Sequence, residues 1–598
     1  MKRDPLFLVV VILLLIAALW LVFELQWHRP VSWDEVEFFR ATRWTGEGRV
    51  PYRDFWEHHT PLQWIAFAPI ARWFGGGAGV QAVLAMRWAQ LPLFAATFFI
   101  VLALMRRCRI GALARGAALL LLACSSVYAL SAIEYRVDTF ANFLFVAGIA
   151  CAMSDRPWKW IGFGVLLSLA VLANMRLAPL TIVAGIAALF WNKAEERWRW
   201  NRDALWMFGG VGAVAAALGT WLFATRSTAA FIGGVIHYNT LANRLVSSSK
   251  TLIPTLLLPF TARDLAGIAL CAAGIAGAVM ALRRLKTPGA LQFLAVLAAA
   301  SIVAFAMLGV QYTYHLGTSF ILLTPLAGWL LDRSRAFVRV GVTMAAGALV
   351  LGAIPLLSSG MREPLLYQDR IMREADAHTA KSDHVWDGCG YALRREPAYR
   401  YWFLPSGVRL MAQRGLIPRY GEREMSARPP AAIVYNLRVH YWLKAFPDAK
   451  RFVVQHYVPV YRNLWMPGTS GVVSARMSVV RAVSAHGRYR VYASPLLLKH
   501  PWFSRPLEMG LIDGPDAPLF KIPLSRVGAQ ITMLVNGAPV DVNRAVELGP
   551  EDAIEFRAPT VERRALSPPK LARQPAGFFL VPEWADELFI APGERYLP

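Results

Sequence analysis

The residues best suited to chemistry lie close together near the amino terminus. Asp34 and Glu35 are adjacent carboxylates just beyond an apolar run, and Glu57, His58 and His59 follow in the same hydrophilic segment. A carboxylate held at a membrane surface suits a general base that accepts a proton from an acceptor hydroxyl. The alternative is an interfacial acid pair without a chemical role, which is common near the ends of apolar segments.

The composition of this segment favours a site. Residues 33–62 contain six acidic side chains and two histidines, interleaved with Trp, Tyr and Phe, and Asp54 is a further candidate. Residues 61–74 are apolar and rich in Trp, which predicts an amphipathic helix along the interface. We therefore expect a polar site built by one loop at the membrane surface.

Two arginines are candidates for binding a phosphate group. Arg136 lies within the run Glu-Tyr-Arg-Val-Asp at 134–138, and Arg176 lies in a very short hydrophilic break between two apolar segments. A charge near membrane depth is costly and usually has a partner or a task, and the guanidinium fork suits phosphate oxygens. The alternative is an arginine that extends its charged end to the lipid headgroups.

Later polar segments supply weaker candidates. His237 lies in the stretch 226–261, and Tyr314 and His315 directly precede an apolar segment. The aromatic residues there also fit an interfacial aromatic belt. Asp34, Glu57, His58 and His59 have side chains that bind metals, but loop acids more often form salt bridges. No metal or other cofactor is predicted, and a divalent cation stays an open alternative.

The elements that must position these residues are membrane spans. The chain has 598 residues, 56% of them hydrophobic, and a mean hydropathy of +0.40. Apolar runs near 20 residues long match the roughly 30 Å thickness of a bilayer core. The first run is interpreted as an uncleaved span, since no small-residue cleavage site follows it. Eleven spans are predicted, at 6–25, 80–105, 112–131, 138–153, 158–173, 177–191, 205–225, 262–281, 289–309, 316–331 and 337–357.

Basic residues alternate between these spans. Clusters of Arg and Lys follow every even-numbered span, and Lys2 and Arg3 precede the first. By the positive-inside tendency, the amino terminus and basic loops are cytoplasmic, while 28–79 and everything after about 358 are periplasmic. The formal net charge of +24 is thereby explained by topology, so nucleic acid is not a predicted partner. Phosphate-binding loops and dinucleotide fingerprints are also missing from the sequence.

The chain after 357 differs in composition from the spans. Residues 358–475 are predicted to be mixed α/β, with strands at 431–435 and 451–454, and residues 476–598 to be rich in β-strand, with strands at 488–492 and 531–535. Asn536-Gly537 before residues 539–542 is a strong hairpin signal. The five cysteines have neither disulfide nor zinc spacing and are interpreted as packing residues.

The first hydrophilic loop resembles that of a known superfamily. The pattern Asp34-Glu35, then the run Gly-Arg-Val-Pro-Tyr-Arg-Asp at 48–54, then Glu-His-His-Thr-Pro-Leu at 57–62 is similar to the first periplasmic loop of GT-C glycosyltransferases. Similar members include bacterial protein O-mannosyltransferases, aminoarabinose transferases and galacturonosyltransferases. The architectural resemblance covers residues 1–357, and its specific residues lie mainly in 32–62.

The resemblance implies roles for individual residues. It assigns the base, or the acid that positions the acceptor, to Asp34, with Glu35 beside it. Many relatives have a Lys before Pro-Pro-Leu that reaches the donor phosphate, whereas this chain has His59 and Thr60 there. A neutral His is a weaker phosphate partner, which shifts that task toward Arg136 and Arg176.

The predicted function is inverting transfer of a sugar from a polyprenyl-phosphate donor at the periplasmic face of a bacterial inner membrane. The acceptor is a lipid, a glycan or a protein, and membrane lipids surround the spans. One alternative is a transporter or flippase of a lipid-linked sugar, although no internal repeat is visible. Another is a non-catalytic assembly protein of envelope polysaccharide, for which eleven spans are more than an anchor needs.

Overall fold

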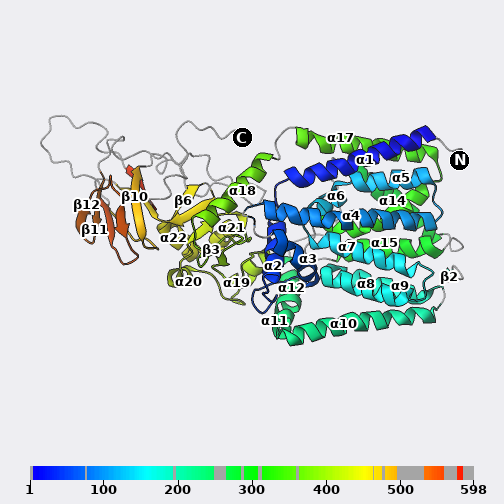
Figure 1. Ribbon diagram of the computed structural model, residues 1–598, viewed down its shortest axis with the longest axis horizontal. Helices are drawn as coiled ribbons and strands as arrows, with labels where there is room; N and C mark the ends of the chain where they lie inside the picture. Colours follow the sequence, from blue (N-terminus) through cyan, green and yellow to red (C-terminus); the bar gives the residue numbers. More distant parts are fainter. Residues whose placement is uncertain are drawn as a thin grey trace. The chain divides into compact units, whose positions relative to one another are not determined.

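The protein is a two-unit chain in the computed structural model, divided by its contacts into Met1–Leu365 and Leu366–Pro598 (Figure 1). The structure describes residues 5–74, 77, 79–192, 197–198, 200–247, 264–283, 289–307, 313–357, 362–461, 463–473, 478–493, 531–557 and 576–582.

The first unit is a bundle of apolar helices. Among the described residues, six helices have the length and composition to cross a membrane: α1 (Pro5–His28), α4 (Gln81–Arg107), α10 (Met207–Ala224, preceded by a 3-10 turn, Arg202–Trp206), α14 (Leu265–Arg283), α15 (Gly289–Ala306) and α17 (Arg335–Leu357). Five apolar helices are shorter: α5 (Ala112–Cys124), α7 (Val137–Ala152), α8 (Lys159–Ala173), α9 (Ala178–Phe190) and α16 (Gly317–Leu331). Each of the eleven predicted spans overlaps one of these helices, with ends that differ by a few residues.

One predicted span is broken in the middle. The segment 112–131 forms α5 and then α6 (Ser126–Ile133), separated at Ser125. The buried carboxylate of Asp264 accepts hydrogen bonds from the backbone N–H groups of Ser126 at 3.2 Å and Val127 at 3.3 Å, and from Gly267 at 2.8 Å. One acid therefore caps the amino-terminal ends of both α6 and α14, and this local satisfaction of N–H groups permits the break.

Small residues let neighbouring helices approach closely. A Cβ atom on Gly210 of α10 would lie 2.3 Å from the carbonyl oxygen of Ile161 on α8, and one on Gly277 of α14 would lie 2.4 Å from the carbonyl oxygen of Leu326 on α16. Such close backbone contact is typical of helices packed within membranes. On the outside of the bundle, large apolar side chains such as Phe99 and Phe223 are 71% and 83% exposed, as expected where lipid replaces water.

Short helices gather at one end of this bundle. Helices α2 (Trp33–Gly46), α3 (Leu62–Phe74), α11 (Thr228–Phe231) and α12 (Tyr238–Ser247) lie at one end, and the hairpin β1–β2 (Trp191–Asn192, Arg197–Trp198) lies at the other (Figure 1). Helix α3 is the helix predicted at 61–74; Trp64 and Phe67 are buried, while Trp73 is 85% exposed. The cytoplasmic and periplasmic assignment of the two ends stays a prediction.

The second unit begins with helices around a mixed sheet. The strand order is β4-β3-β5-β7-β6, with β3 (His384–Trp386) parallel to β4 (Glu396–Pro397) and β5 (Ala432–Val434), and β7 (Leu464–Pro467) antiparallel to β5 and β6 (Tyr457–Tyr461). The helices are α18 (Arg362–Ala377), α19 (Ser406–Gln413), α20 (Glu422–Ala427), α21 (Leu437–Ala445) and α22 (Pro447–His456). The strand predicted at 431–435 is confirmed as β5.

The strand predicted at 451–454 is wrong, because these residues belong to α22. Pro447 occupies the first turn, where its missing N–H costs nothing. The buried residues Ala449, Phe452 and Val453 repeat at three- and four-residue spacing, which is the helical period. A short apolar run is compatible with either a strand or a helix, and it was interpreted as a strand.

The rest of the second unit is β-structure. One sheet has the order β13-β10-β15-β8 and the other β12-β11-β14-β9. The predicted strands at 488–492 and 531–535 correspond to β10 (Gly487–Ala493) and β11 (Thr532–Val535). The predicted hairpin joins β11 to β12 (Ala538–Val540), with positive φ angles of 52° at Asn536 and 82° at Gly537, as that turn requires. The other strands are β8 (Thr469–Val473), β9 (Val479–Arg481), β13 (Val546–Leu548), β14 (Ile554–Arg557) and β15 (Ala576–Pro582).

Candidate active site

Helix α2 holds the acidic pair. Ser32 caps its start, because its hydroxyl accepts from the N–H of Glu35 at 3.4 Å while the Glu35 carboxylate accepts from the N–H of Ser32 at 2.9 Å. This reciprocal capping box fixes where the helix begins. Asp34 and Glu35 therefore lie in the first turn, where the helix dipole favours negative charge.

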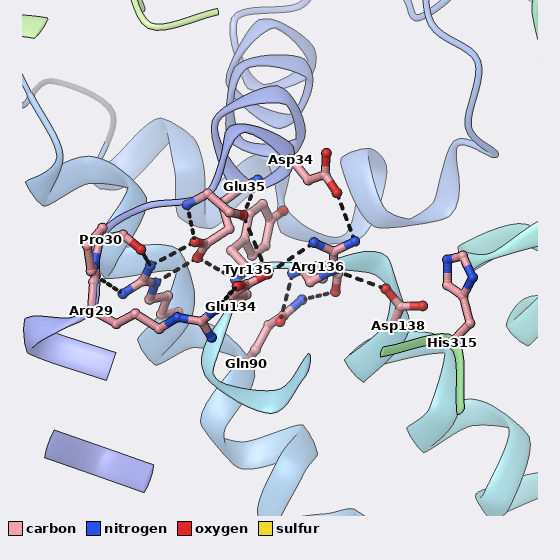
Figure 2. Close-up of polar contacts among 12 residues, drawn as sticks. Arg29, Pro30, Asp34, Glu35, Gln90, Glu134, Tyr135, Arg136, Asp138 and His315 are labelled. Atoms are coloured by element: carbon pink, nitrogen blue, oxygen red, sulfur yellow. Dashed lines mark hydrogen bonds and ion pairs between the residues drawn. The ribbon is translucent and has the colours of Figure 1, made fainter. Parts of the chain in front are cut away.

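Glu35 is a buried structural anchor. Its carboxylate accepts from Arg87 of α4 at 2.6 Å and 2.7 Å and from the N–H of Tyr135 at 2.8 Å (Figure 2). Burial opposes ionisation of Glu35. The charge and hydrogen bonds of Arg87, together with hydrogen bonds from the backbone N–H groups of Ser32 and Tyr135, nevertheless lower the pKa of Glu35 below its usual value. Because both oxygens are occupied and the side chain is fully buried, Glu35 holds α2 against α4 and is poorly placed to meet an acceptor.

Arg136 lies among three carboxylates. Its guanidinium contacts Asp34 at 2.9 Å, Glu134 at 3.0 Å and Asp138 at 3.3 Å (Figure 2). The Arg136 side chain is 4% exposed, whereas that of Asp34 is 17% exposed. Arg136 therefore fixes the Asp34 carboxylate at a position that keeps some access from outside.

Glu134 extends this group of ion pairs. Its carboxylate also contacts Arg29 at 3.0 Å, so it lies between the guanidinium groups of Arg29 and Arg136. Among the three carboxylates that contact Arg136, Asp34 has the most exposed side chain, and exposure to the acceptor suits a group that accepts a proton.

A small polar pocket adjoins this network inside the bundle. It has a volume of about 40 Å³, enough for water-sized groups, and its lining includes Asp138, Asn174, Arg176, His315 and Thr318. Asn174 donates to Asp138 at 3.0 Å, and Arg176 contacts the His315 ring. Burial and the charges of Arg176 and Arg136 lower the pKa of His315 well below its usual range, so this ring is neutral near pH 7. Two residues that line the pocket, Asp138 and Asn174, thus link Arg136 to Arg176 through a chain of polar contacts.

A second cluster lies one helical turn from Asp34. Glu37 of α2 converges with Glu57, His58 and His59, whose ligand atoms all lie within 4.8 Å of one another. Burial opposes ionisation of Glu57, but hydrogen bonds from His58 and His59 outweigh it and lower the pKa of Glu57 to about 2. Burial and the neighbouring His59 lower the pKa of His58 to about 4. The cluster at pH 7 therefore has an ionised Glu57 and a neutral His58.

The loop that carries this cluster is held on several sides. Tyr52 has a φ of 71°, in the left-handed region, and its hydroxyl donates to the carbonyl of His59 at 2.7 Å. Asn239 of α12 donates to the carbonyl of His58 at 2.7 Å. Tyr238 packs edge-on against the His58 ring, with centroids 5.1 Å apart. Strained backbone maintained by so many contacts is typical of functional sites.

The remaining predicted residues have other surroundings where the structure describes them. Asp54 pairs with Arg53 at 2.7 Å and accepts from the N–H of Val50 at 2.7 Å; the hydrogen bonds from Arg53 lower its pKa. His237 is exposed on the π-helical segment Ile232–His237, and its neighbour Tyr238 contacts the loop instead. The side chain of Tyr314 lies outside the described residues.

Four important residues were not singled out from sequence. Arg87 is a charge within an apolar segment, a signal that usually marks a buried partner. Glu134 and Asp138 flank Arg136 at two residues on either side, and Glu37 follows Asp34 by three residues, which places both on one helical face. Glu37 could be placed beside Asp34 only if a helix was predicted there. The spacing Ser32-x-x-Glu35, which is typical of a capping box, indicated that helix.

The comparisons with known proteins give distant structural likenesses. No protein-family model and no curated protein matches the sequence. Similar solved structures include ArnT from Cupriavidus metallidurans bound to undecaprenyl phosphate, with a TM-score of 0.47 and 15% identity over 73% of this chain and 94% of that chain. Another is the oligosaccharyltransferase AglB from Archaeoglobus fulgidus in complex with an inhibitory peptide and a dolichol-phosphate, with a TM-score of 0.46 and 12% identity over 82% of this chain and 73% of that chain. Because both TM-scores are below 0.5, we infer the chemistry from this chain's own residues.

Proposed function

We propose that this chain is a GT-C-type glycosyltransferase that moves a sugar from a polyprenyl-phosphate donor to an acceptor hydroxyl at the periplasmic face of the inner membrane. The observation that carries the proposal is the partly exposed Asp34 carboxylate, fixed 2.9 Å from Arg136 at the end of a bundle of apolar helices. A carboxylate and several cations at the end of the bundle suit a polyprenyl-phosphate donor. The lipid of that donor would lie among the helices, and its sugar would lie at their end.

In this mechanism, Asp34 accepts the proton of the acceptor hydroxyl. The hydroxyl oxygen forms a bond to the anomeric carbon as the bond from that carbon to the phosphate oxygen breaks. The electron pair of the broken bond leaves with the polyprenyl phosphate. A direct displacement of this kind inverts the anomeric centre, and Asp34 is the carboxylate of the network best exposed to meet the acceptor.

The departing phosphate needs positive charge nearby, which is often a large part of catalysis. Arg176 suits this task better than Arg136, since the three donor nitrogens of Arg136 face Asp34, Glu134 and Asp138. His59 is directed to Glu57 at 3.0 Å. We therefore assign the phosphate to Arg176, with His315 beside it, and a positioning role to Arg136.

The decisive experiment replaces the base. In purified full-length protein supplied with polyprenyl-phosphate sugars, Asp34→Asn should lower the transfer rate by about 100-fold or more, because general-base catalysis contributes roughly 10²–10⁴-fold. Glu47→Gln is the matched control, since Glu47 pairs with Arg43 at the exposed end of α2. Asp34→Asn that folds and transfers sugar at the wild-type rate would refute the assignment.

The same assay separates transfer from transport. A flippase moves the lipid-linked sugar across the membrane and returns it intact, whereas the proposed enzyme releases polyprenyl phosphate in step with glycosylated product. Mass spectrometry of envelope lipids and glycans from cells with wild-type or Asp34→Asn protein would then identify the sugar and the acceptor.

A further inference from the structure

We propose that Glu37, Glu57, His58 and His59 form a binding site for a divalent metal ion of the zinc type. The site joins helix α2 to the loop after it, and each of the four residues supplies one donor atom. The proposal concerns metal binding itself, and it stands or fails separately from sugar transfer.

The separations between donor atoms fit one small ion. Nδ1 of His58 lies 3.5 Å from both Glu37 Oε1 and Glu57 Oε1, and Nδ1 of His59 lies 3.8 Å and 3.0 Å from the same two oxygens. Tetrahedral zinc with bonds of about 2.0–2.1 Å places its ligand atoms roughly 3.3 Å apart. These four distances bracket that value, and all four donor atoms lie within 4.8 Å of one another, so side-chain movements that close the wider separations would bring them onto one ion.

A second observation points to a ligand. Glu57 is 1% exposed, and although its Oε1 accepts three hydrogen bonds, its Oε2 is buried and has no hydrogen-bond partner among the described residues. A buried carboxylate oxygen without a donor is costly. A metal ion in the cluster would bring positive charge to this carboxylate and would offset the cost of its unpartnered oxygen.

The chemistry of the four side chains selects the kind of ion. Two imidazoles with two carboxylates favour zinc or a similar transition metal, whereas magnesium and calcium prefer all-oxygen sites. The two carboxylates also balance the double positive charge of the ion. The neighbouring Trp56 ring stacks on His58 with centroids 5.1 Å apart, and it restricts the orientation of that imidazole.

The ion would connect the loop to the helix that carries Asp34. Glu37 lies three residues after Asp34 and therefore on the same face of α2. Phe38 lies between the two groups, with its ring centroid 5.1 Å from that of His59 and 5.9 Å from the Arg136 guanidinium carbon. Metal binding would thus fix residues 57–59 beside the proposed base without using Asp34 as a ligand.

The test measures zinc in the purified full-length protein. After chelation and dialysis against Zn²⁺, elemental analysis should find one zinc per chain, retained through gel filtration. Glu57→Gln and His58→Gln should each weaken zinc binding by tenfold or more in a competition titration with a chelating dye. Glu47→Gln should bind as the wild type does, because Glu47 lies directly after the same helix and outside the cluster.

X-ray absorption of the wild-type protein keeps the proposal falsifiable if a variant does not fold. The zinc edge should show imidazole scattering and a first shell of nitrogen and oxygen near 2.0 Å. Absence of retained zinc, a zinc shell without imidazole, or unchanged affinity in folded Glu57→Gln and His58→Gln would each overturn the proposal.

Discussion

Asp34 and Glu35 show how two adjacent acids acquire different tasks. Glu35 points to Arg87 and the start of α2, where it is fully buried, while Asp34 points to Arg136 and keeps 17% of its side-chain surface exposed (Figure 2). The helical turn of about 100° per residue separates their directions. A fully paired, buried acid stabilises the fold, and the partly exposed one is available for proton transfer.

A stability prediction follows from the Glu35–Arg87 pair. Arg87→Met should lower the free energy of unfolding by about 3–5 kcal/mol, because it leaves the Glu35 charge buried without its cation. Thermal unfolding in detergent would measure the loss. Adding Glu35→Leu to Arg87→Met should recover only part of it, because Arg87 also donates to the carbonyl oxygens of Gln26, Arg29 and Pro30.

The pair Arg43–Glu47, which is more exposed, is the control for that prediction. Its side chains are 16% and 39% exposed, against 0% for both side chains of the buried pair, and ion pairs open to solvent contribute about 0–1 kcal/mol. Arg43→Met should therefore change the unfolding temperature little. Equal losses in Arg43→Met and Arg87→Met would show that the buried pair has no special weight.

At the scale of elements, the loop after α2 is positioned by a neighbouring helix. The π-helical segment Ile232–His237 approaches the loop so closely that a Cβ atom on Gly234 would lie 2.5 Å from the carbonyl oxygen of Glu57. Helix α12 then supplies Asn239, which binds the carbonyl of His58. The placement of residues 57–59 therefore depends on a segment far along the chain.

Gly234→Ala should displace this loop. We expect a loss of about 1–3 kcal/mol in the free energy of unfolding, typical of overpacking, together with a lower transfer rate. Gly233→Ala is the matched control, because a Cβ atom there meets nothing within 4 Å. Equal behaviour of the two variants in thermal unfolding and transfer assays would contradict a role for the close approach.

At the scale of the molecule, the first unit has two chemically different ends. The acidic network and the Glu37–Glu57–His58–His59 cluster lie where α2 and α3 gather, whereas α4 ends in Arg106 and Arg107 toward the β1–β2 end (Figure 1). The positive-inside tendency predicts that the β1–β2 end is cytoplasmic. Under the proposed function, donor sugar and acceptor would then meet in the periplasm.

This orientation predicts a labelling pattern. In a cysteine-free variant, Glu47→Cys should react with a membrane-impermeant maleimide in intact spheroplasts, and Arg109→Cys should react only after permeabilisation. Labelling is read by a mass shift on gels. The reverse pattern would place Asp34 in the cytoplasm and would refute the proposed site of transfer.

The sequence by itself determined the features that depend on local pattern. Each of the eleven spans overlaps an apolar helix, since hydropathy is read within one segment, and Asn536-Gly537 formed its hairpin because two residues determine that turn. The motif at 32–62 also identified Asp34 as the candidate base. The local pattern did not distinguish a helix from a strand at 451–454, because four residues are too few to separate the helical period from the strand period.

Only the tertiary structure decided which acid is buried and which partners it has. Glu35 meets Arg87 across 52 residues and the N–H of Tyr135 across 100, and contacts so distant in the chain leave no periodicity to read. Likewise, Glu37 joined the loop histidines only because α2 folds beside residues 57–59. The environment that separates a structural carboxylate from a reactive one is made by packing, because burial and charge pairing are properties of neighbours in space.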